Sequence, residues 1–321
     1  MAEALPAVDA IDRNALVDRR GRAYRAVKAG LVPRWWRVWA DVAGGYAALA
    51  ATAVALDVLE RTAPRMLLLW ILVGALLFGW TIAFIQLFLH EAAHWNLAPD
   101  RTWNDRLANL FVGLLTGQDV AAYRRVHFDH HRHLGTPRDT ERSYFAALDG
   151  RFLAEALCGV AALRVLRTRD RALATADVDR PGRRRAMLVA GILLNAGVVA
   201  LAAATGRWAI AVAWPLGIAA VHPVINATRQ LLEHRSFEAR RDVDYAAVAH
   251  GPVTRMFAGG LVSRTLGGAG FDRHLLHHWE PQLSYTRLAD LEAFLLDTPS
   301  GAVFRAQTTT YGRAFRRLFR A

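Results

Sequence analysis

The fold is decided by residues 66–94, which read MLLLWILVGALLFGWTIAFIQLFLHEAAH. Residues 66–89 carry no charged side chain, and a helix of about 20 apolar residues is long enough to cross a bilayer. The motif HEAAH follows at once, with His90 and His94 four positions apart. On a helix this spacing puts both imidazoles on one face. The stretch therefore predicts a membrane-spanning helix that delivers two histidines to the membrane surface.

Three further stretches have the length and composition of membrane spans: 42–59, 186–204 and 208–226. Short turns join the four spans into two pairs. The stretch 42–59 contains a single charge, Asp57, near its end. Apolar pieces at 107–117 and 152–163 are too short to cross, and we expect them in the interface or against the core. The sequence thus predicts an all-α membrane protein of four transmembrane helices in two hairpins, with a cytosolic helical cap that carries the histidines.

Charge fixes the expected orientation. The chain is 54% hydrophobic, yet its formal net charge is +12. The N-terminal arm has 8 Arg and Lys, the loop 95–185 has 16 and the segment from 229 onward has 13, whereas the two hairpin turns hold 3. Because positive residues stay on the cytoplasmic side, we expect both termini and all the histidine motifs to be cytoplasmic. The basic residues lie beside apolar spans, which disfavours nucleic-acid binding.

These patterns predict an integral protein of a bacterial inner membrane with three parts. We expect a basic cytosolic arm at 1–40, a membrane and cap domain at 41–290, and a basic cytosolic tail at 291–321. The only cysteine, Cys158, excludes an internal disulfide and a cysteine-rich metal site.

Histidine spacing carries the functional information. Eight of the 12 histidines lie in three motifs: HEAAH at 90–94, HFDHH at 127–131 and HLLHH at 274–278. His234 follows the fourth span just as His90 follows the second, and Gln230, one turn earlier, is placed to hydrogen-bond a metal-bound water. The candidate metal ligands are therefore nine: His90, His94, His127, His130, His131, His234, His274, His277 and His278. We assign His133, His222 and His250 to structure.

Nine imidazoles are too many for one ion, and four to five nitrogens per metal indicate two metals. Imidazole suits iron, copper or zinc. Two zinc ions would need no such nitrogen-rich site, and copper more often has Cys or Met ligands, so iron fits best. Acidic neighbours that could orient the imidazoles through their free N–H groups, or could equally be surface charges, are Glu91, Asp129, Asp272 and Glu280.

Two other classes of protein stay open on this pattern. HEAAH also matches the HExxH pattern of zinc proteases, in which Glu91 would be the general base. Such a site needs one further ligand and leaves the other motifs unexplained. A non-catalytic membrane metal-binding protein would hold metal without any O₂-dependent turnover.

The order HEAAH, HFDHH, EH and HLLHHWEP between paired spans resembles the membrane fatty-acid desaturase/hydroxylase superfamily over roughly residues 40–285. Pro281 and Tyr285 also fit this resemblance. It implies two non-haem Fe ions held by the nine histidines, O₂ as co-substrate, and attack on an unactivated C–H bond of a membrane lipid or acyl substrate. Since the chain has no fused haem-binding HPGG segment, it implies an external electron donor, either a ferredoxin or a cytochrome with its reductase.

The resemblance favours a fatty-acyl desaturase. A lipid or alkyl hydroxylase, or a carotenoid oxygenase, would use the same site, because desaturation and hydroxylation share the first hydrogen abstraction. We also consider Arg229 and Arg235 as contacts for an anionic headgroup or carrier, against the simpler role of positive-inside anchors.

Overall fold

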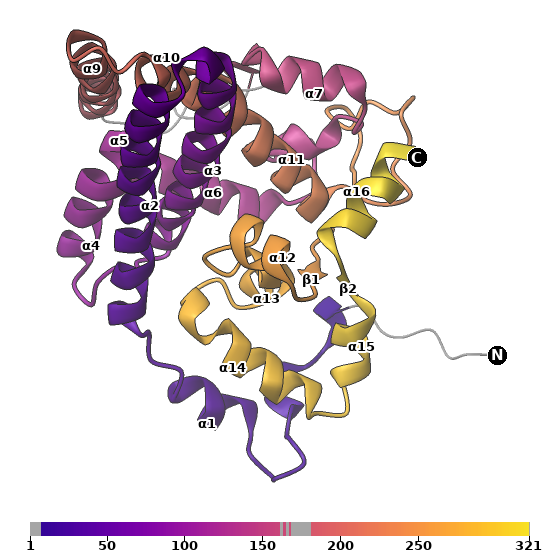
Figure 1. Cartoon of the computed structure of the whole chain (residues 1–321). Helices are drawn as coiled ribbons and strands as arrows, with labels where there is room; N and C mark the ends of the chain where they lie inside the picture. The colour runs from indigo at the N-terminus through magenta and orange to yellow at the C-terminus, as the bar shows by residue number, and fades with distance from the viewer. Residues whose placement is uncertain (1–7, 161–162, 165–166, 168–180, 321) are drawn as a thin grey trace.

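The structure is a computed structural model that describes residues 8–160, 163–164, 167 and 181–320 (Figure 1). Four helices in it are long and apolar enough to cross a membrane, as the sequence predicts. They are α2 (Trp35–Thr62), α3 (Leu67–Ala93, preceded by the short turn η3, Pro64–Met66), α9 (Pro181–Ala204), and a rod formed by α10 (Trp208–Leu216), the π-helical turn η6 (Gly217–Val221) and α11 (His222–His234).

The two hairpin turns lie at the same end of the bundle. Arg207 in the second turn is 2.9 Å from the Asp57 carboxylate near the end of α2. The backbone N–H of Trp208 donates to Glu60 at 3.0 Å. Because these contacts join the turns, the opposite ends of α3 and α11, which carry histidines, also lie together (Figure 1).

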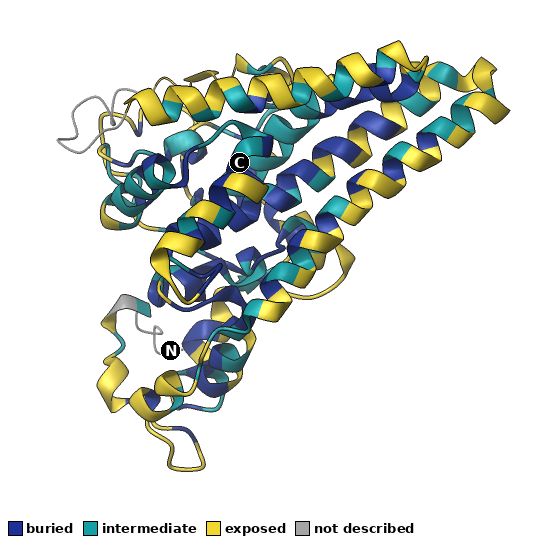
Figure 2. Ribbon diagram, turned by 90° about the vertical axis from the view of Figure 1, so that its left-hand side faces the viewer, coloured by how far each residue is buried: buried dark blue, intermediate teal, exposed yellow. Residues whose placement is uncertain are grey.

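The outer faces of the long helices are apolar and exposed, whereas the faces turned toward the interior are buried (Figure 2). Leu68 on α3 is 70% exposed, and Leu193 and Leu201 on α9 are both 66% exposed, while Phe78 and Ile82 on α3 are buried. Large contiguous apolar surfaces are unfavourable in water and mark contact with a membrane or a partner. Together with the helix lengths, this surface makes the chain an integral membrane protein.

Helices α3 and α10–η6 cross with their backbones in contact. A Cβ added to Gly79 would lie 2.5 Å from the Val221 Cβ and 2.7 Å from the Gly217 carbonyl oxygen, so glycine is required there. The crossing falls on the π-helical turn η6. Such a turn inserts one additional residue into a helix and is frequent near functional sites. This close approach holds the final turns of α3 and α11 at fixed positions relative to each other.

The cap is built from short helices on the histidine side of the bundle: α4 (Arg101–Ala108), η4 (Asn109–Gly113), α5 (Leu114–Thr116), α6 (Val120–His133), η5 (Arg142–Phe145), α7 (Gly150–Leu157), α12 (Leu261–Leu266), η7 (Phe271–Arg273) and α13 (His274–Trp279). The apolar piece at 107–117 corresponds to the end of α4, η4 and α5. The piece at 152–163 begins in α7, and its residues 161–162 lie outside the described residues.

The two ends of the chain pack on this cap. The N-terminal arm has η1 (Val8–Ala10), η2 (Arg13–Ala15) and α1 (Tyr24–Ala29), and the C-terminal part has α14 (Tyr285–Leu296), α15 (Gly301–Ala306) and α16 (Tyr311–Arg320). Strand β1 (Met256–Phe257) pairs in parallel with β2 (Thr308–Thr309). The boundaries predicted at residues 40 and 290 fall inside α2 and α14.

Candidate metal centre

Helix ends and one cap helix position the histidines. His90 lies in the last turn of α3, and His94 follows its C-terminus. Helix α6 begins at an Asp119 cap, whose carboxylate accepts from the Ala122 N–H at 3.0 Å, and carries the second motif in its last two turns. Helix α13 consists almost entirely of the third motif.

A first group of imidazoles comes from all three motifs. Its members, which all offer a nitrogen within 4.8 Å of the others, are His90, His94, His127, His131 and His277. The Nε2 atom of His127 lies 2.9 Å from that of His94 and 3.0 Å from that of His131. The Nε2 atom of His131 is also 3.1 Å from that of His277.

A second group adjoins the first and uses the remaining candidates. His130, His234 and His278 form one set of mutually close nitrogens, and His234 with His274 and Glu233 form another. The Nε2 atom of His274 lies 2.9 Å from that of His234 and 3.2 Å from that of His278. The structure therefore brings all nine predicted histidines together, as one group of five and one of four.

The separations fit metal ions better than hydrogen bonds. A neutral imidazole nitrogen offers either one proton or one lone pair, so His127 Nε2 cannot hydrogen-bond well to two other Nε2 atoms at once. Nitrogens bound at about 2.0–2.1 Å to one ion, by contrast, lie roughly 2.9–3.4 Å apart for angles between square and tetrahedral. Neither ring nitrogen of buried His90 has a hydrogen-bond partner among the described residues, so a lone pair on this ring is available to an ion.

The protonation state suits metal binding. Burial, followed by repulsion from neighbouring imidazoles, lowers the pKa of His131, His277 and His278 well below the ordinary histidine value. Neutral imidazole is the form that donates a lone pair to a metal. The group is thus prepared for cations before any ion arrives.

Two carboxylates and one backbone carbonyl contact the Nδ1 atoms of three of these imidazoles, on the side away from the clustered Nε2 atoms. The Nδ1 atom of His130 lies 2.9 Å from Asp139, and that of His127 lies 3.4 Å from Glu141. The Nδ1 atom of His234 lies 2.9 Å from the Val253 carbonyl oxygen. Such partners select the tautomer that leaves Nε2 free and raise its basicity. The Asp139 carboxylate is in turn held by the Tyr144 hydroxyl at 2.5 Å.

A comparison with known protein families agrees with this geometry. The family model described as fatty acid desaturase matches residues 65–306. The chain belongs to the fatty acid desaturase family. No curated protein matches the sequence. Family membership makes the protein an oxidoreductase that acts on lipids, and it confirms both the predicted family and the all-helical membrane fold.

The same findings weigh against the protease alternative. In this desaturase-family chain, His90 and His94 share their group with three histidines from two other helices, which a one-zinc HExxH site would not use. Glu91, the general base in that alternative, is buried and accepts from the Tyr285 N–H at 3.1 Å.

The five predicted supporting residues have different surroundings. Glu91 lies 3.6 Å from the His90 Nδ1 atom, near the imidazole but beyond hydrogen-bond distance. Gln230 accepts from the Ser143 hydroxyl. The other three carboxylates pair with groups other than imidazoles, in line with the alternative of surface charges: Asp129 with Arg132, Asp272 with Arg273, and Glu280 with Tyr24 and Lys28.

Sequence reasoning missed Asp139 and Glu141 as the partners of His130 and His127. The available signal was the sequence Gly135-Thr-Pro137 shortly after the end of α6, where the chain reverses and returns along that helix. Glu233 was also passed over, although its carboxylate lies 3.9 Å from His274 Nε2 and 3.4 Å from Arg229.

Two of the three histidines assigned to structure, His222 and His250, have contacts of that kind. His222 interacts with Gln86 inside the bundle, and His250 accepts from the Ser236 N–H at 3.1 Å. Arg235 is buried and donates to the Phe145 carbonyl at 2.8 Å, and Arg229 lies over the Phe271 ring at 4.3 Å. Both arginines thus have partners inside the cap, which favours a structural role over contact with a headgroup.

Proposed function

We propose that this chain is a fatty-acyl desaturase in which two iron ions are held by nine histidines and O₂ is the co-substrate. The observation that carries the proposal is the pair of adjoining imidazole groups, five and four in number, at the ends of the membrane helices. Five nitrogens would come from His90, His94, His127, His131 and His277. Four would come from the set His130, His234 and His278 together with His274, which lies next to His234 and His278. When bound, the two irons would supply, with O₂, the oxidising power needed to attack an unactivated C–H bond.

The chain's own residues would position the metal ligands and exclude water from the site. Asp139 and Glu141 orient imidazoles of α6 from outside. The Phe271 ring lies parallel to His274, with centroids 5.0 Å apart, and 4.6 Å from His90. An apolar ring in this position excludes water from the imidazoles, and exclusion of water suppresses side reactions.

The position of the site suits a lipid substrate. The histidines lie at the ends of α3 and α11, opposite the hairpin turns, so an acyl chain could approach from the bilayer while electrons arrive from the other side. The distribution of basic residues supports a cytoplasmic location for this side and for both termini. We place the protein in a bacterial inner membrane, since a chain with a single lysine among its 40 basic residues is typical of GC-rich genomes.

Metal content of the detergent-purified chain tests the proposal. The wild type should bind about two Fe per chain, and His131→Ala should lower this sharply because His131 belongs to the five-histidine group. The control is His133→Ala, two positions further along α6 and outside both groups. One zinc per chain that His131→Ala leaves unchanged would refute the diiron site. Zinc in both positions would call for iron reconstitution, since sites can load the wrong metal.

Product analysis then separates desaturase from hydroxylase. A desaturase leaves a new double bond in cellular or added acyl lipids, whereas a hydroxylase leaves an alcohol on the same carbon. The first hydrogen abstraction is common to both, so only the product decides between them. An alcohol as the main product would overturn the desaturase proposal and keep the diiron site.

A further inference from the structure

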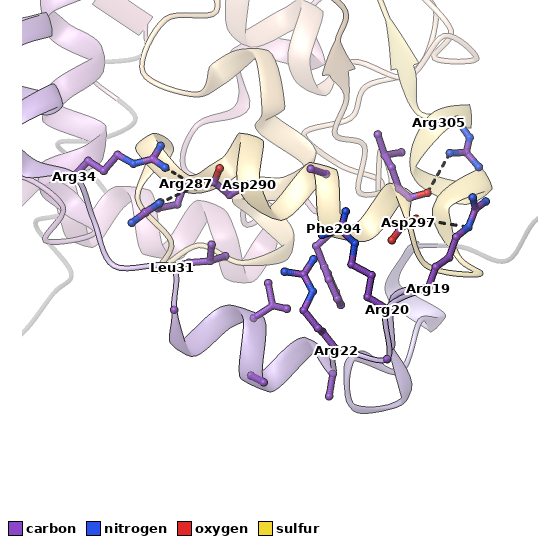
Figure 3. A pocket seen from close by; sticks show the side chains of 17 residues that line it. Arg19, Arg20, Arg22, Leu31, Arg34, Arg287, Asp290, Phe294, Asp297 and Arg305 are labelled. Atoms are coloured by element: carbon purple, nitrogen blue, oxygen red, sulfur yellow. Dashed lines mark hydrogen bonds and ion pairs between the residues drawn. The ribbon is translucent and has the colours of Figure 1, made fainter.

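A basic groove runs between the N-terminal arm and α14 on the side of the cap away from the hairpin turns (Figures 1 and 3). Its volume is ≈ 1580 Å³, and it is lined on one side by residues 19–34 and on the other by α14 and α15. Six arginines line it, and we call it the arginine groove: Arg19, Arg20, Arg22, Arg34, Arg287 and Arg305.

The positive charge of the arginine groove is only partly compensated. Its lining includes two carboxylates, Asp290 and Asp297. Asp290 pairs with Arg34 at 3.1 Å and Arg287 at 2.9 Å, and Asp297 lies 3.5 Å from the largely exposed Arg19. Arg22 also pairs at 2.7 Å with Asp18, beside the groove. Six arginines against three aspartates still leave a positive surface, and this surface fits a partner with a negatively charged face.

Buried aromatic rings connect the floor of the groove to the third histidine motif. Phe294 lines the groove, and its ring centroid lies 6.1 Å from that of Tyr24. The Tyr24 ring lies 5.3 Å from that of Trp279, which directly follows His278 in the chain. Tyr24 also donates to Glu280, which fixes the arm against the end of α13.

This connection is packed rather than open. Tyr24 and Trp279 are each 4% exposed, and Phe294 is 2% exposed. Side chains packed to the density of a protein interior leave no room for an acyl chain to pass. Electrons, however, can tunnel through packed protein. The groove is therefore better placed to deliver electrons to the histidines than to deliver a substrate.

We propose that the arginine groove docks an acidic one-electron carrier protein, which passes electrons through the Tyr24–Trp279 contact toward His278. The inference rests on the proposed function. In a desaturation, O₂ takes up four electrons and four protons and becomes two waters. The substrate supplies two of each as its two C–H bonds become a double bond, so two reduced carriers must be oxidised and two further protons taken from solvent. Electron-transfer encounters are small and charge-steered, as an open basic groove allows.

Binding of an acidic [2Fe–2S] ferredoxin of the plant type to the full-length, detergent-solubilised chain tests the proposal. The variant is Arg19→Glu/Arg20→Glu, because both side chains are exposed and Arg20 makes no ion pair within the described residues. At low salt we expect the affinity to fall at least about tenfold. The matched control is Arg313→Glu/Arg316→Glu on the exposed face of α16, which changes the net charge equally outside the groove and should leave the affinity within about twofold.

Equal affinities in the wild type and the Arg19→Glu/Arg20→Glu variant, or a wild type that does not bind the ferredoxin, would overturn the proposal. So would a variant that keeps the ferredoxin but loses binding to phosphatidylglycerol vesicles, since the groove would then be a membrane contact.

Turnover with a chemical reductant keeps this test separate from the proposed function. Dithionite with a viologen mediator bypasses docking, so both double variants should form product with it as the wild type does. With reduced ferredoxin, only the Arg19→Glu/Arg20→Glu variant should be slow. No lipid product from the iron-loaded wild type with the chemical reductant would count against the proposed function, and the binding titration would still decide whether the groove docks an acidic carrier.

Discussion

Replacement of Asp139 by asparagine is the sharpest test of how the second metal position is supported. The buried Asp139 carboxylate lies 2.9 and 3.0 Å from His130 Nδ1 through its two oxygens. It also accepts from the Tyr144 hydroxyl at 2.5 Å and from the Glu141 N–H at 2.8 Å. Asparagine keeps the shape of this side chain but has only one acceptor oxygen and no charge.

The expected magnitude follows from these contacts. The amide oxygen would best face His130 and the Glu141 N–H, which are both donors, so the amide NH₂ would face Tyr144. The bond to His130 then changes from charge-assisted to neutral, which removes roughly half of its strength, about 1 kcal/mol. The hydrogen bond donated by Tyr144 is also lost, at about 1 kcal/mol. Both losses leave His130 less basic and less firmly oriented, and such changes at outer-sphere partners weaken metal binding about 10- to 100-fold, so we expect roughly 30-fold.

A chelator titration measures this effect. In Asp139→Asn we expect one of the two irons to be removed at about 30-fold lower chelator activity, while the iron of the five-histidine group keeps its wild-type retention. The control is Asp129→Asn, which removes a partly exposed carboxylate of the same helix that pairs with Arg132. Retention of both irons in Asp139→Asn at wild-type affinity would show that Asp139 does not support a metal ligand.

Two further substitutions test the structure around the site. Gly135→Ala places a Cβ 2.1 Å from the Gly251 carbonyl oxygen at a φ of +73° and should lower the Tm of the solubilised protein clearly more than Gly251→Ala, which has strained φ but open space; equal losses would refute the packing argument. Burial lowers the pKa of His250, whose Nε2 accepts from Ser236, so its contribution is present above pH 6.5 and is lost as the pH falls below that value. His250→Gln should therefore show a smaller drop in Tm on acidification than the wild type, and an identical drop would contradict this role.

Hydropathy made the membrane helices predictable from the sequence. The observed helices extend the predicted spans by several residues at some ends, as in α2, which begins at Trp35 rather than at 42. The extension follows because polar residues such as Arg37 and Asp41 end an apolar run but do not end a helix. Composition sets the apolar part of a span, but packing and capping set where its helix ends.

The candidate metal ligands were predictable because their spacing is a local property of each helix. The carboxylates that support them were not predictable, because they are brought close by the fold of more distant residues. His127 and His131 share a helix face whatever the rest of the chain does. Asp129 lies inside the same motif, yet at the helix surface, and it pairs with solvent-facing Arg132. Asp139 reaches His130 only because the chain turns back after α6. The positive charge of the N-terminal arm was visible too, but the groove it forms depends on α14, more than 250 residues away.

The division of the histidines between the two groups explains why the HxxHH spacing occurs twice. In α6 the first and last histidines of the motif, His127 and His131, belong to the five-membered group, and His130 belongs to the other. In α13 the assignment is reversed, because the middle histidine, His277, is the one that joins the five-membered group.

Adjacent residues on a helix differ by about 100° in direction, so the two members of each HH pair point toward different histidine groups. The first histidine of the motif lies one turn before the last one and joins the same group as the last. Each of the two helices thus contributes to both positions at once. A helix that served one ion would need only the i, i+4 pair, as in HEAAH. The middle histidine of each motif, His130 in α6 and His277 in α13, is therefore the feature that fits two neighbouring metal positions, as the proposed diiron site has them, rather than two separate ones.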